Sequence, residues 1–203
     1  MQNSFVQGLK FKVSVFLFLI SHFSFLIFSS CGQQAFTPKP HGYQRIDFPK
    51  KEYVHYENPC HYAMEIPVYS SIERNHYYTA EPCWYNLRFP QFNAILHLSY
   101  KPVINRDTLF KFFDDSRTMV YKHIIKADDI VENYLSNEKF HGIFYELNGN
   151  TATNAQFYIT DSANHFLRGS LYFESRTNGD SIAPVLAFLK KDILHMLNTL
   201  EWK

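Results

Sequence analysis

The residue types that could do chemistry gather in one short stretch, where Thr160, Asp161 and Ser162 are followed by His165 and Arg168. A serine beside an imidazole could act as a nucleophile with its general base, which is the arrangement of a hydrolase. The alternative is a tight connection between two strands, in which Asp161 and Ser162 bond backbone donors and Arg168 forms an ion pair. Residues three apart across a turn rarely orient a serine and an imidazole correctly, so we favour the second interpretation.

A second polar cluster lies at the end of an expected helix and consists of Tyr121, Lys122 and His123 with Lys126, Asp128 and Asp129. It could be a basic patch that contacts a ligand or a partner. It could equally be the solvated end of a helix, where cations are favoured by the helix dipole. From the two clusters together, the candidate contacts with a partner are Tyr121, Lys122, Lys126, Asp161, His165 and Arg168.

The ten histidines are scattered along the chain. His123, His141, His165 and His195 would have to be brought together by the fold before they could bind a metal ion. The sequence contains no G-x-S-x-G elbow, phosphate-binding loop, H-E-x-x-H or C-x-x-C motif. We therefore predict that the protein is not an enzyme and holds neither a metal ion nor a cofactor.

The N-terminus has the three parts of a secretory signal. Lys10 and Lys12 form a basic region, Val13 to Phe28 is an almost unbroken apolar run, and Ser29 and Ser30 precede Cys31. The ending F-S-S-C resembles the lipobox, although Phe28 stands where a leucine is usual. The apolar run is short against the roughly 20 residues that span a bilayer. We predict a lipoprotein signal peptide over residues 1–30 and a membrane lipid on Cys31; an uncleaved anchor or plain secretion is the alternative.

Without residues 1–30, 173 residues remain and the formal charge changes from +1 to −1. This length suits one well-buried domain. A near-neutral chain argues against nucleic acid as a partner. The aromatic content of 18% points to a core rich in strands.

Cys60 and Cys83 are left as a pair once Cys31 carries lipid. Disulfides form and persist in exported proteins. Two cysteines without a nearby Cys/His doublet make a poor zinc site, because such sites normally need four ligands. We predict a Cys60–Cys83 disulfide that is worth roughly 3–3.5 kcal/mol on the chain-entropy account.

Residues 31–58 are expected to form a tether between the lipid and a globular domain at 59–203. Pro38, Pro40 and Pro49 remove backbone donors and favour extended chain. No acidic run follows Cys31 directly, which favours the periplasmic side of the envelope over the outer face of the cell.

Strand patterns begin at Tyr62. Along Ala94–Tyr100, His97 and Ser99 alternate with leucines, so one face is more polar than the other. The disulfide would hold the first of these strands beside the third. The expected strands are Tyr62–Ile66, Val68–Glu73, Trp84–Phe89, Ala94–Tyr100, Asp128–Ser136, Gly142–Leu147, Ala155–Thr160 and Phe166–Phe173. Short links between the last three predict an antiparallel meander, whereas Asp128–Ser136 is also compatible with a continued helix.

Two amphipathic helices are expected, one in the middle and one at the end. The first expected helix runs from Arg106 to Lys126, with Asn105 or Asp107 as its N-cap. One face of this helix holds Leu109, Phe112, Phe113, Ser116, Met119, Val120 and His123. Ser181–Leu200 has Asp180 or Ser181 as its N-cap, Pro184 in the first turn and Asp192 paired with nearby lysines. The fold class is therefore α+β: one antiparallel sheet packed with a middle and a C-terminal helix. The order of elements resembles the Mog1/PsbP-like arrangement, which says nothing about activity.

Several segments also carry a resemblance to a known family: PKPHGYQRIDFPKKEY, PCWYNLRFP, LHLSYKPV, DDSRTMVYKHIIKADDI and the block from Gln156 to Lys203. From Cys31 to Lys203 the chain resembles the gliding motility lipoprotein GldD family. Thr177 and His61 stand where that family's pattern suggests proline.

The resemblance implies a membrane-tethered accessory protein of gliding motility and of the type IX secretion system. It also implies action with an integral inner-membrane partner, GldE, and neither an enzymatic activity nor a cofactor. Two other functions stay open at this point. One is a hydrolase or metal-dependent enzyme built on Ser162 and His165. The other is a carrier of a small ligand or lipid, which would need a sizeable pocket on the sheet.

Overall fold

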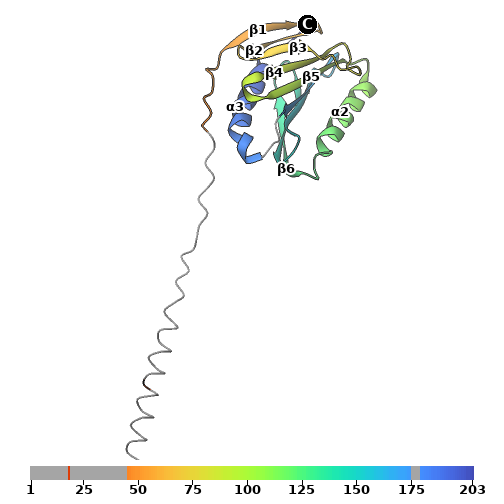
Figure 1. The fold of residues 1–203 in the computed structure, drawn as a ribbon. Coiled ribbons are helices and arrows are strands. Elements are labelled where there is room, and N and C mark those ends of the chain that lie inside the picture. The colour runs from red at the N-terminus through yellow and green to blue at the C-terminus, as the bar shows by residue number, and fades with distance from the viewer. Residues whose placement is uncertain (1–17, 19–44, 175–178) are drawn as a thin grey trace, which may run out of the picture. The chain divides into compact units, whose positions relative to one another are not determined.

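The computed structural model describes residue 18, residues 45–174 and residues 179–203 (Figure 1). The chain divides into two units, Met1–Gly42 and Tyr43–Lys203. The predicted signal peptide and Cys31 belong to the first unit, and apart from Phe18 they lie outside the described residues.

The described residues of this unit form two helices and ten strands, together with a short 3-10 turn at Pro90–Phe92. The helices are α2 (Arg106–Tyr121) and α3 (Gly179–Asn198). The strands are β1 (Tyr53–Asn58), β2 (Tyr62–Pro67), β3 (Ser71–Arg74), β4 (Trp84–Phe89), β5 (Ala94–Pro102), β6 (Ala127–Ser136), β7 (His141–Gly149), β8 (Thr153–Thr160), β9 (His165–Phe173) and β10 (Glu201–Trp202).

The strands form a seven-stranded sheet in the order β3-β4-β5-β9-β8-β7-β6 and a three-stranded sheet in the order β1-β2-β10. All the pairings within both sheets are antiparallel. The predicted meander is confirmed, because β7, β8 and β9 are consecutive neighbours. Asp128–Ser136 is a strand, as expected, and pairs with β7 along nearly its whole length.

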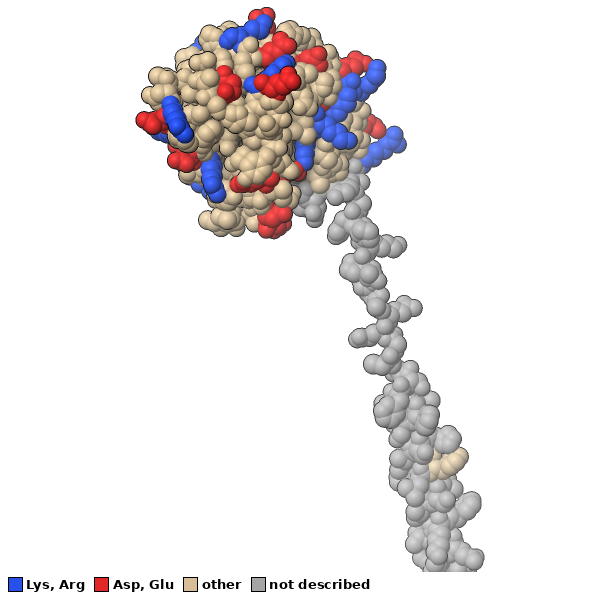
Figure 2. Space-filling model, turned by 180° about the vertical axis from the view of Figure 1, so that it is seen from behind, with Lys and Arg blue, Asp and Glu red and all other residues tan. Residues whose placement is uncertain are grey.

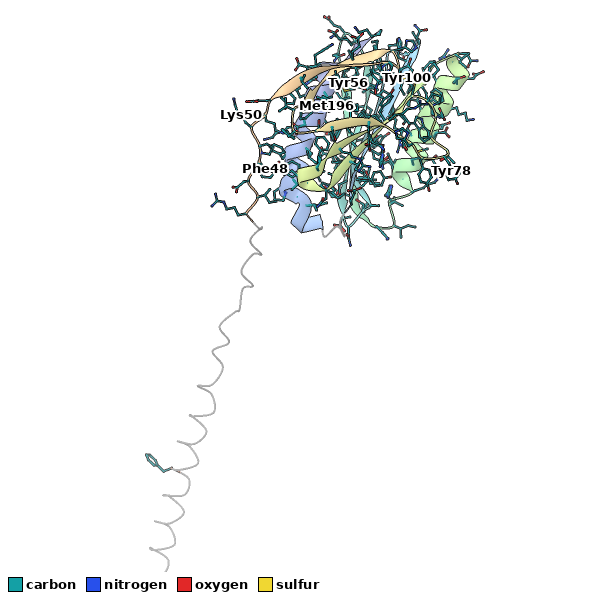
Figure 3. The ribbon with its side chains drawn as sticks, turned by 45° about the horizontal axis from the view of Figure 1, so that its top comes forward. Phe48, Lys50, Tyr56, Tyr78, Tyr100 and Met196 are labelled. Atoms are coloured by element: carbon teal, nitrogen blue, oxygen red, sulfur yellow. A yellow bond between two sulfur atoms is a disulfide. The ribbon has the colours of Figure 1, made fainter. Side chains whose placement is uncertain are left out.

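The large sheet has two different faces because successive side chains in a strand point to opposite sides. One face packs against α3 and the small sheet, and it holds the main core, in which Leu96, Phe157 and Leu171 meet Ile193 and Met196. Tyr56 of β1 packs on the edge of this core (Figure 3). On the other face, Val120 of α2 packs with Tyr145 and Leu147 in a second cluster. The predicted fold class, α+β with a middle and a C-terminal helix, is confirmed.

Helix α2 begins where the sequence indicates and ends earlier. The Asn105 side chain accepts the backbone N–H of Thr108 at 2.8 Å, so Asn105 is the N-cap. The helix ends at Tyr121, and residues 122–126 form a turn instead of continuing it to Lys126. Met119 lies on the predicted face together with Phe112 and Ser116, but its side chain is exposed instead of buried.

Helix α3 packs through residues spaced three and four apart, among them Val185, Leu189 and Ile193, as its amphipathic pattern predicts. Its N-terminus differs from expectation. The helix already includes Gly179, so Asp180 and Ser181 lie inside it and the predicted N-cap was wrong. Pro184 lies beyond the first turn.

The small sheet joins the beginning and the end of the domain. Strand β1 lies within the segment expected to be tether, and it pairs with β2, which also pairs with the two-residue β10. Residues before β1 also join the fold. Lys51 Nζ lies 2.6 Å from Asp192 Oδ1 in α3, and the Tyr53 hydroxyl donates to the same oxygen at 2.9 Å. Asp192 therefore pairs with a lysine, as predicted, but this lysine comes from the N-terminal segment and not from the helix.

The predicted disulfide between Cys60 and Cys83 is present, with its Cα atoms 5.7 Å apart. Cys60 lies in the turn between β1 and β2, and Cys83 directly precedes β4. These strands belong to different sheets. The expectation that the disulfide holds the first expected strand beside the third was therefore wrong, because β2 and β4 are not paired and the bond ties the small sheet to the large one.

The surface carries charges of both signs. On the face shown in Figure 2, acidic and basic residues are interspersed, without one large area of a single sign. Over the residues that the structure describes, no helix combines the length and apolarity needed to cross a bilayer.

Candidate functional site

The polar stretch 160–165 forms the connection between β8 and β9. Asp161 Oδ1 accepts the backbone N–H groups of Ala163, Asn164 and His165 at 2.9–3.0 Å. Burial raises the pKa of Asp161, but these three donors outweigh it, so the pKa lies below its usual value. Asp161 thus shapes a tight turn, which is the structural role that we favoured.

Ser162 does not pair with His165. The register of β7 and β8 sets His141 opposite Thr160, and the Ser162 hydroxyl lies 2.7 Å from His141 Nε2 at an exposed position. His165 points elsewhere: its Nδ1 lies 2.9 Å from the Tyr100 hydroxyl, and its ring stacks on Trp202. Burial lowers the pKa of His165. The nucleophile and base proposed for a hydrolase are therefore apart.

The Ser162–His141 pair lacks the rest of a hydrolytic site. Within the described ranges no carboxylate bonds the second nitrogen of His141, so nothing would orient the imidazole as a base. Likewise, no group of three or more His, Cys, Asp or Glu side chains in that part of the chain could hold a metal ion. The four histidines singled out in the sequence are not brought together as a metal site.

Tyr121, Lys122 and Lys126 lie at the opposite end of the large sheet. The Tyr121 hydroxyl donates to Glu132 Oε1 at 2.9 Å, and both lysines are exposed in the turn that leads to β6. That turn lies where Ala127 pairs with Gly149, whereas the 160–165 connection lies where His141 pairs with Thr160. The structure thus places the two candidate clusters at two ends of the domain.

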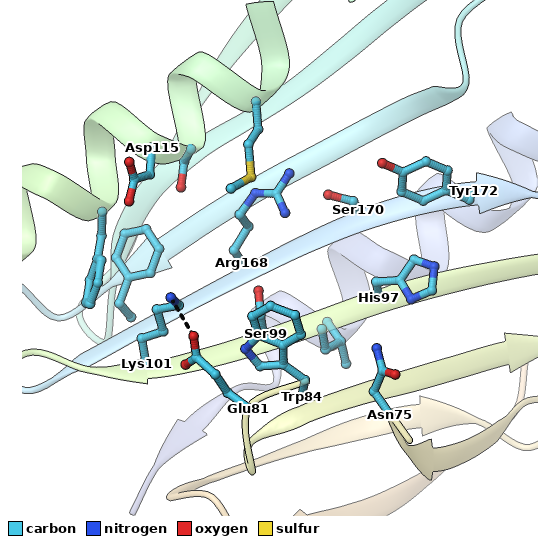
Figure 4. Close-up of a pocket in the computed structure, with 15 residues that line it drawn as sticks. Asn75, Glu81, Trp84, His97, Ser99, Lys101, Asp115, Arg168, Ser170 and Tyr172 are labelled. Carbon is cyan, nitrogen blue, oxygen red and sulfur yellow. Dashed lines mark hydrogen bonds and ion pairs between the residues drawn. The ribbon is translucent and has the colours of Figure 1, made fainter. Parts of the chain in front are cut away.

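Arg168 lies in neither cluster, because it lines a cavity of about 450 Å³ between α2 and the large sheet (Figure 4). The floor comes from two paired strands: Ser99 of β5 lies opposite Arg168 of β9, and His97 lies opposite Ser170. Helix α2 covers one side, and the segment from Asn75 to Trp84 closes the other. The full lining is Asn75, Glu81, Trp84, His97, Leu98, Ser99, Lys101, Phe112, Asp115, Ser116, Met119, Phe166, Arg168, Ser170 and Tyr172.

The two cations of the cavity differ in their partners. Lys101 Nζ lies 3.0 Å from Glu81 Oε1 and 5.4 Å from the centre of the Phe112 ring, so its charge is compensated. Arg168 Nη2 donates at 2.6 Å to the amide oxygen of Gln156, a neutral group. Among the described side chains no carboxylate lies within ion-pair distance of Arg168, so the ion pair expected for it was wrong. Burial lowers the pKa of this guanidinium, which nevertheless stays charged at neutral pH.

The charge of Arg168 acts on two nearby histidines. The pKa of His97 is lowered by burial and further by Arg88 and Arg168, and the pKa of His123 is lowered by burial and by Arg168. Both imidazoles are therefore neutral at pH 7. His97 Nδ1 lies 2.7 Å from the Asn86 side-chain oxygen, which fixes its ring in the floor of the cavity. Arg168 is thus the one cation of the cavity lining without a carboxylate within ion-pair distance among the described residues.

The sequence contained a signal for this cavity. His97 and Ser99 form the polar face of β5, and Arg168 lies at the same spacing from Ser170 and Tyr172 in β9. These two polar faces form the floor of the cavity only because β5 pairs with β9. The two strands are far apart in sequence, since α2, β6, β7 and β8 lie between them. Strand order is a property of the fold, which a local pattern does not indicate.

Comparison with solved structures gives cyanobacterial PsbP (CyanoP) from Synechocystis sp. PCC 6803, known from a solution structure. The two share 10% sequence identity with a TM-score of 0.46, over 81% of this chain and 100% of that chain. Comparison with curated proteins found no match. Comparison with protein families matches residues 33–202 to the family described as gliding motility lipoprotein GldD. This match spans most of the sequence, and the chain therefore belongs to the gliding motility lipoprotein GldD family.

Proposed function

We propose that this protein is a lipid-anchored, non-catalytic accessory component of the gliding motility and type IX secretion apparatus. It faces the periplasm and acts by binding an integral inner-membrane partner, GldE, and other components of the same machinery. The observation that carries this proposal is the family match over residues 33–202. Membership of a lipoprotein family also supports anchoring at the cell envelope.

The way in which the polar side chains are used fits an assembly role better than catalysis. Asp161 holds three backbone donors of a turn, His165 packs against Trp202, and Tyr121 ties α2 to β6. Each of these groups stabilises the domain. A partner contact must therefore come from side chains that the fold leaves exposed.

The turn between α2 and β6, residues 122–126, is the strongest candidate for this contact. Ile124 is 58% exposed and Ile125 is 91% exposed, and Lys122 and Lys126 flank them. A single exposed isoleucine is ordinary, but two adjacent ones between cations form an apolar tip with a basic rim. We place the partner contact on this turn, which retains Lys122 and Lys126 from the original candidates.

The contact can be tested by crosslinking in intact cells. A photoreactive residue at position 125 is expected to capture an inner-membrane protein, because a side chain this exposed can reach a bound partner. The additional change Lys122→Glu with Lys126→Glu should lower the yield about tenfold or more, because it reverses both charges of the rim and sets them against the partner groups that they attract.

Ile104 provides a matched control, because it is 82% exposed and precedes the other end of α2. A photoreactive residue at position 104 should not capture the same protein. Equal capture from both positions, or capture of abundant lipoproteins only, would contradict the assignment of the contact to residues 122–126.

The lipid anchor is tested separately at Cys31. Cys31→Ala should abolish incorporation of a labelled fatty acid and release the protein from membranes, because the sulfur atom is the proposed attachment point. Cells are grown with the labelled fatty acid, and the protein is then isolated and fractionated. Cys31→Ala protein that still carries label would rule out this site of attachment. If Cys31→Ala protein folds normally and the cells lose secretion and gliding, the function of the protein depends on its anchoring at the membrane.

A further inference from the structure

The cavity beside α2 has the features of a binding site for a small molecule. Its volume of about 450 Å³ falls in the range usual for ligand pockets. Its walls are largely apolar and aromatic, with Trp84, Phe112, Phe166 and Met119 around a floor of polar side chains. Figure 4 shows Arg168 rising from the floor between Asp115 on one side and Ser170 and Tyr172 on the other.

The guanidinium of Arg168 is the feature that selects a ligand. It is half-buried, and the one hydrogen bond that it donates among the described residues goes to the neutral Gln156. A desolvated cation is costly unless it is paired. Its planar set of donors fits the two oxygens of a carboxylate. An anion that entered the cavity would therefore find a preformed partner.

We propose that the cavity binds a small monoanionic organic acid, with its carboxylate on Arg168 and its apolar body between Trp84, Phe112 and Phe166. This proposal goes beyond the assembly role and does not depend on it.

The other charges of the cavity limit the ligand to one negative charge. Lys101 is already paired with Glu81, and Asp115 of α2 adds a second carboxylate to the lining. The four charges sum to zero, but only Arg168 lacks a nearby carboxylate. A dianion such as a phosphate monoester would place its second charge near Asp115 and Glu81, where repulsion disfavours it. The aromatic walls in turn favour an acid with an apolar body over a small polar one such as acetate.

Binding can be followed through the protein's own fluorescence. The chain contains two tryptophans, and Trp84 lines the cavity whereas Trp202 stacks on His165. In the full-length protein with Trp202→Phe, the emission therefore reports on Trp84. Titration with 3-phenylpropionate should change it saturably, with a dissociation constant of about 1 mM or lower, as expected for a ligand of this size. The neutral 3-phenylpropanamide should bind at least about tenfold more weakly, because it lacks the charge that pairs with Arg168. The dianion phenyl phosphate should also bind at least about tenfold more weakly, because Asp115 and Glu81 repel its second charge.

Two variants test the roles of the charges by calorimetry. Arg168→Met should weaken 3-phenylpropionate binding about tenfold or more, because it removes the cation but keeps most of the volume. Asp115→Asn should strengthen it about two- to fivefold, because it removes a repelling charge at an exposed position where folding is not at risk. Equal binding of acid and amide, no saturable signal with any probe, or no gain from Asp115→Asn would overturn the proposal.

Discussion

Replacing Asp192 with alanine is expected to lower the free energy of unfolding by about 3–5 kcal/mol, the loss typical of breaking a buried ion pair by removing one partner. The Asp192 side chain is fully buried, and that of Lys51 is 28% exposed. The carboxylate also accepts the hydroxyls of Tyr53 at 2.9 Å and Tyr69 at 2.6 Å. Alanine would leave a half-buried cation and two hydroxyl groups without their acceptor, next to a new cavity.

Urea unfolding of the full-length protein measures this loss. Lys191→Met is the matched control, because Lys191 is the exposed neighbour of Asp192 in α3, and it should change stability by less than about 0.5 kcal/mol. Burial and the hydrogen bond to Asp192 together raise the pKa of Tyr53 to about 12. Asp192→Ala should move that pKa back toward 10, because it removes the hydrogen bond while the burial of Tyr53 remains. A loss of stability no larger than that of Lys191→Met would show that Lys51 and Asp192 are not paired.

Removing the disulfide by Cys60→Ala with Cys83→Ala is expected to cost about 3 kcal/mol. The two cysteines are 23 residues apart, and freeing a loop of this length adds conformational entropy to the unfolded chain. Cys60 is buried in the main core, so the loss of its sulfur also removes packing. The folded domain keeps both sheets, because the strand pairings do not depend on the bond.

Unfolding of the wild-type protein with and without reductant gives an independent measure of the same quantity. The reduced wild-type protein should lose slightly less stability than the double variant, because it keeps the Cys60 sulfur in the core. The double variant itself should not respond to reductant. Peptide mapping without reduction should find Cys60 joined to Cys83. Free thiols at both positions would contradict the disulfide and the loss of stability that depends on it.

Much of the fold could be predicted from local patterns. The bounds of β4 agree with the expected strand, and Asn105 caps α2, because alternation and capping are decided within a few residues. Strand β1 was missed, since most of its residues are at least partly exposed and show no clear apolar alternation. Strand β10 has only two residues and exists through its pairing with β2. Strands of this kind form because of tertiary contacts, so the local sequence pattern does not predict them.

In the candidate sites, too, local contacts could be predicted from the sequence, whereas contacts between distant segments could not. Asp161 was expected to bond backbone donors in a turn, and it does, because the turn is local. The pairing of Ser162 with His141 depends on the register of β7 and β8, so spacing along the chain suggested His165 instead. The pairing of Lys51 with Asp192 and the position of Arg168 in a cavity likewise depend on which strands and helices become neighbours.

The small sheet also determines how the domain would respond to a pull on its N-terminal side. Tyr53 pairs with Pro67 at the open end of the β1–β2 hairpin, and Asn58 pairs with Tyr62 at its closed end. Tension would first load the contacts of Asp47 with Gln91 and of Phe48 with Phe188, and then the ion pair between Lys51 and Asp192. It would then open the hairpin pair by pair from Tyr53 onward. Peeling would stop at Cys60, where a covalent bond passes the force to Cys83 and the large sheet. As long as the large sheet stays folded, only the chain before Cys60 can extend, which limits the reach of a molecule held from its N-terminus.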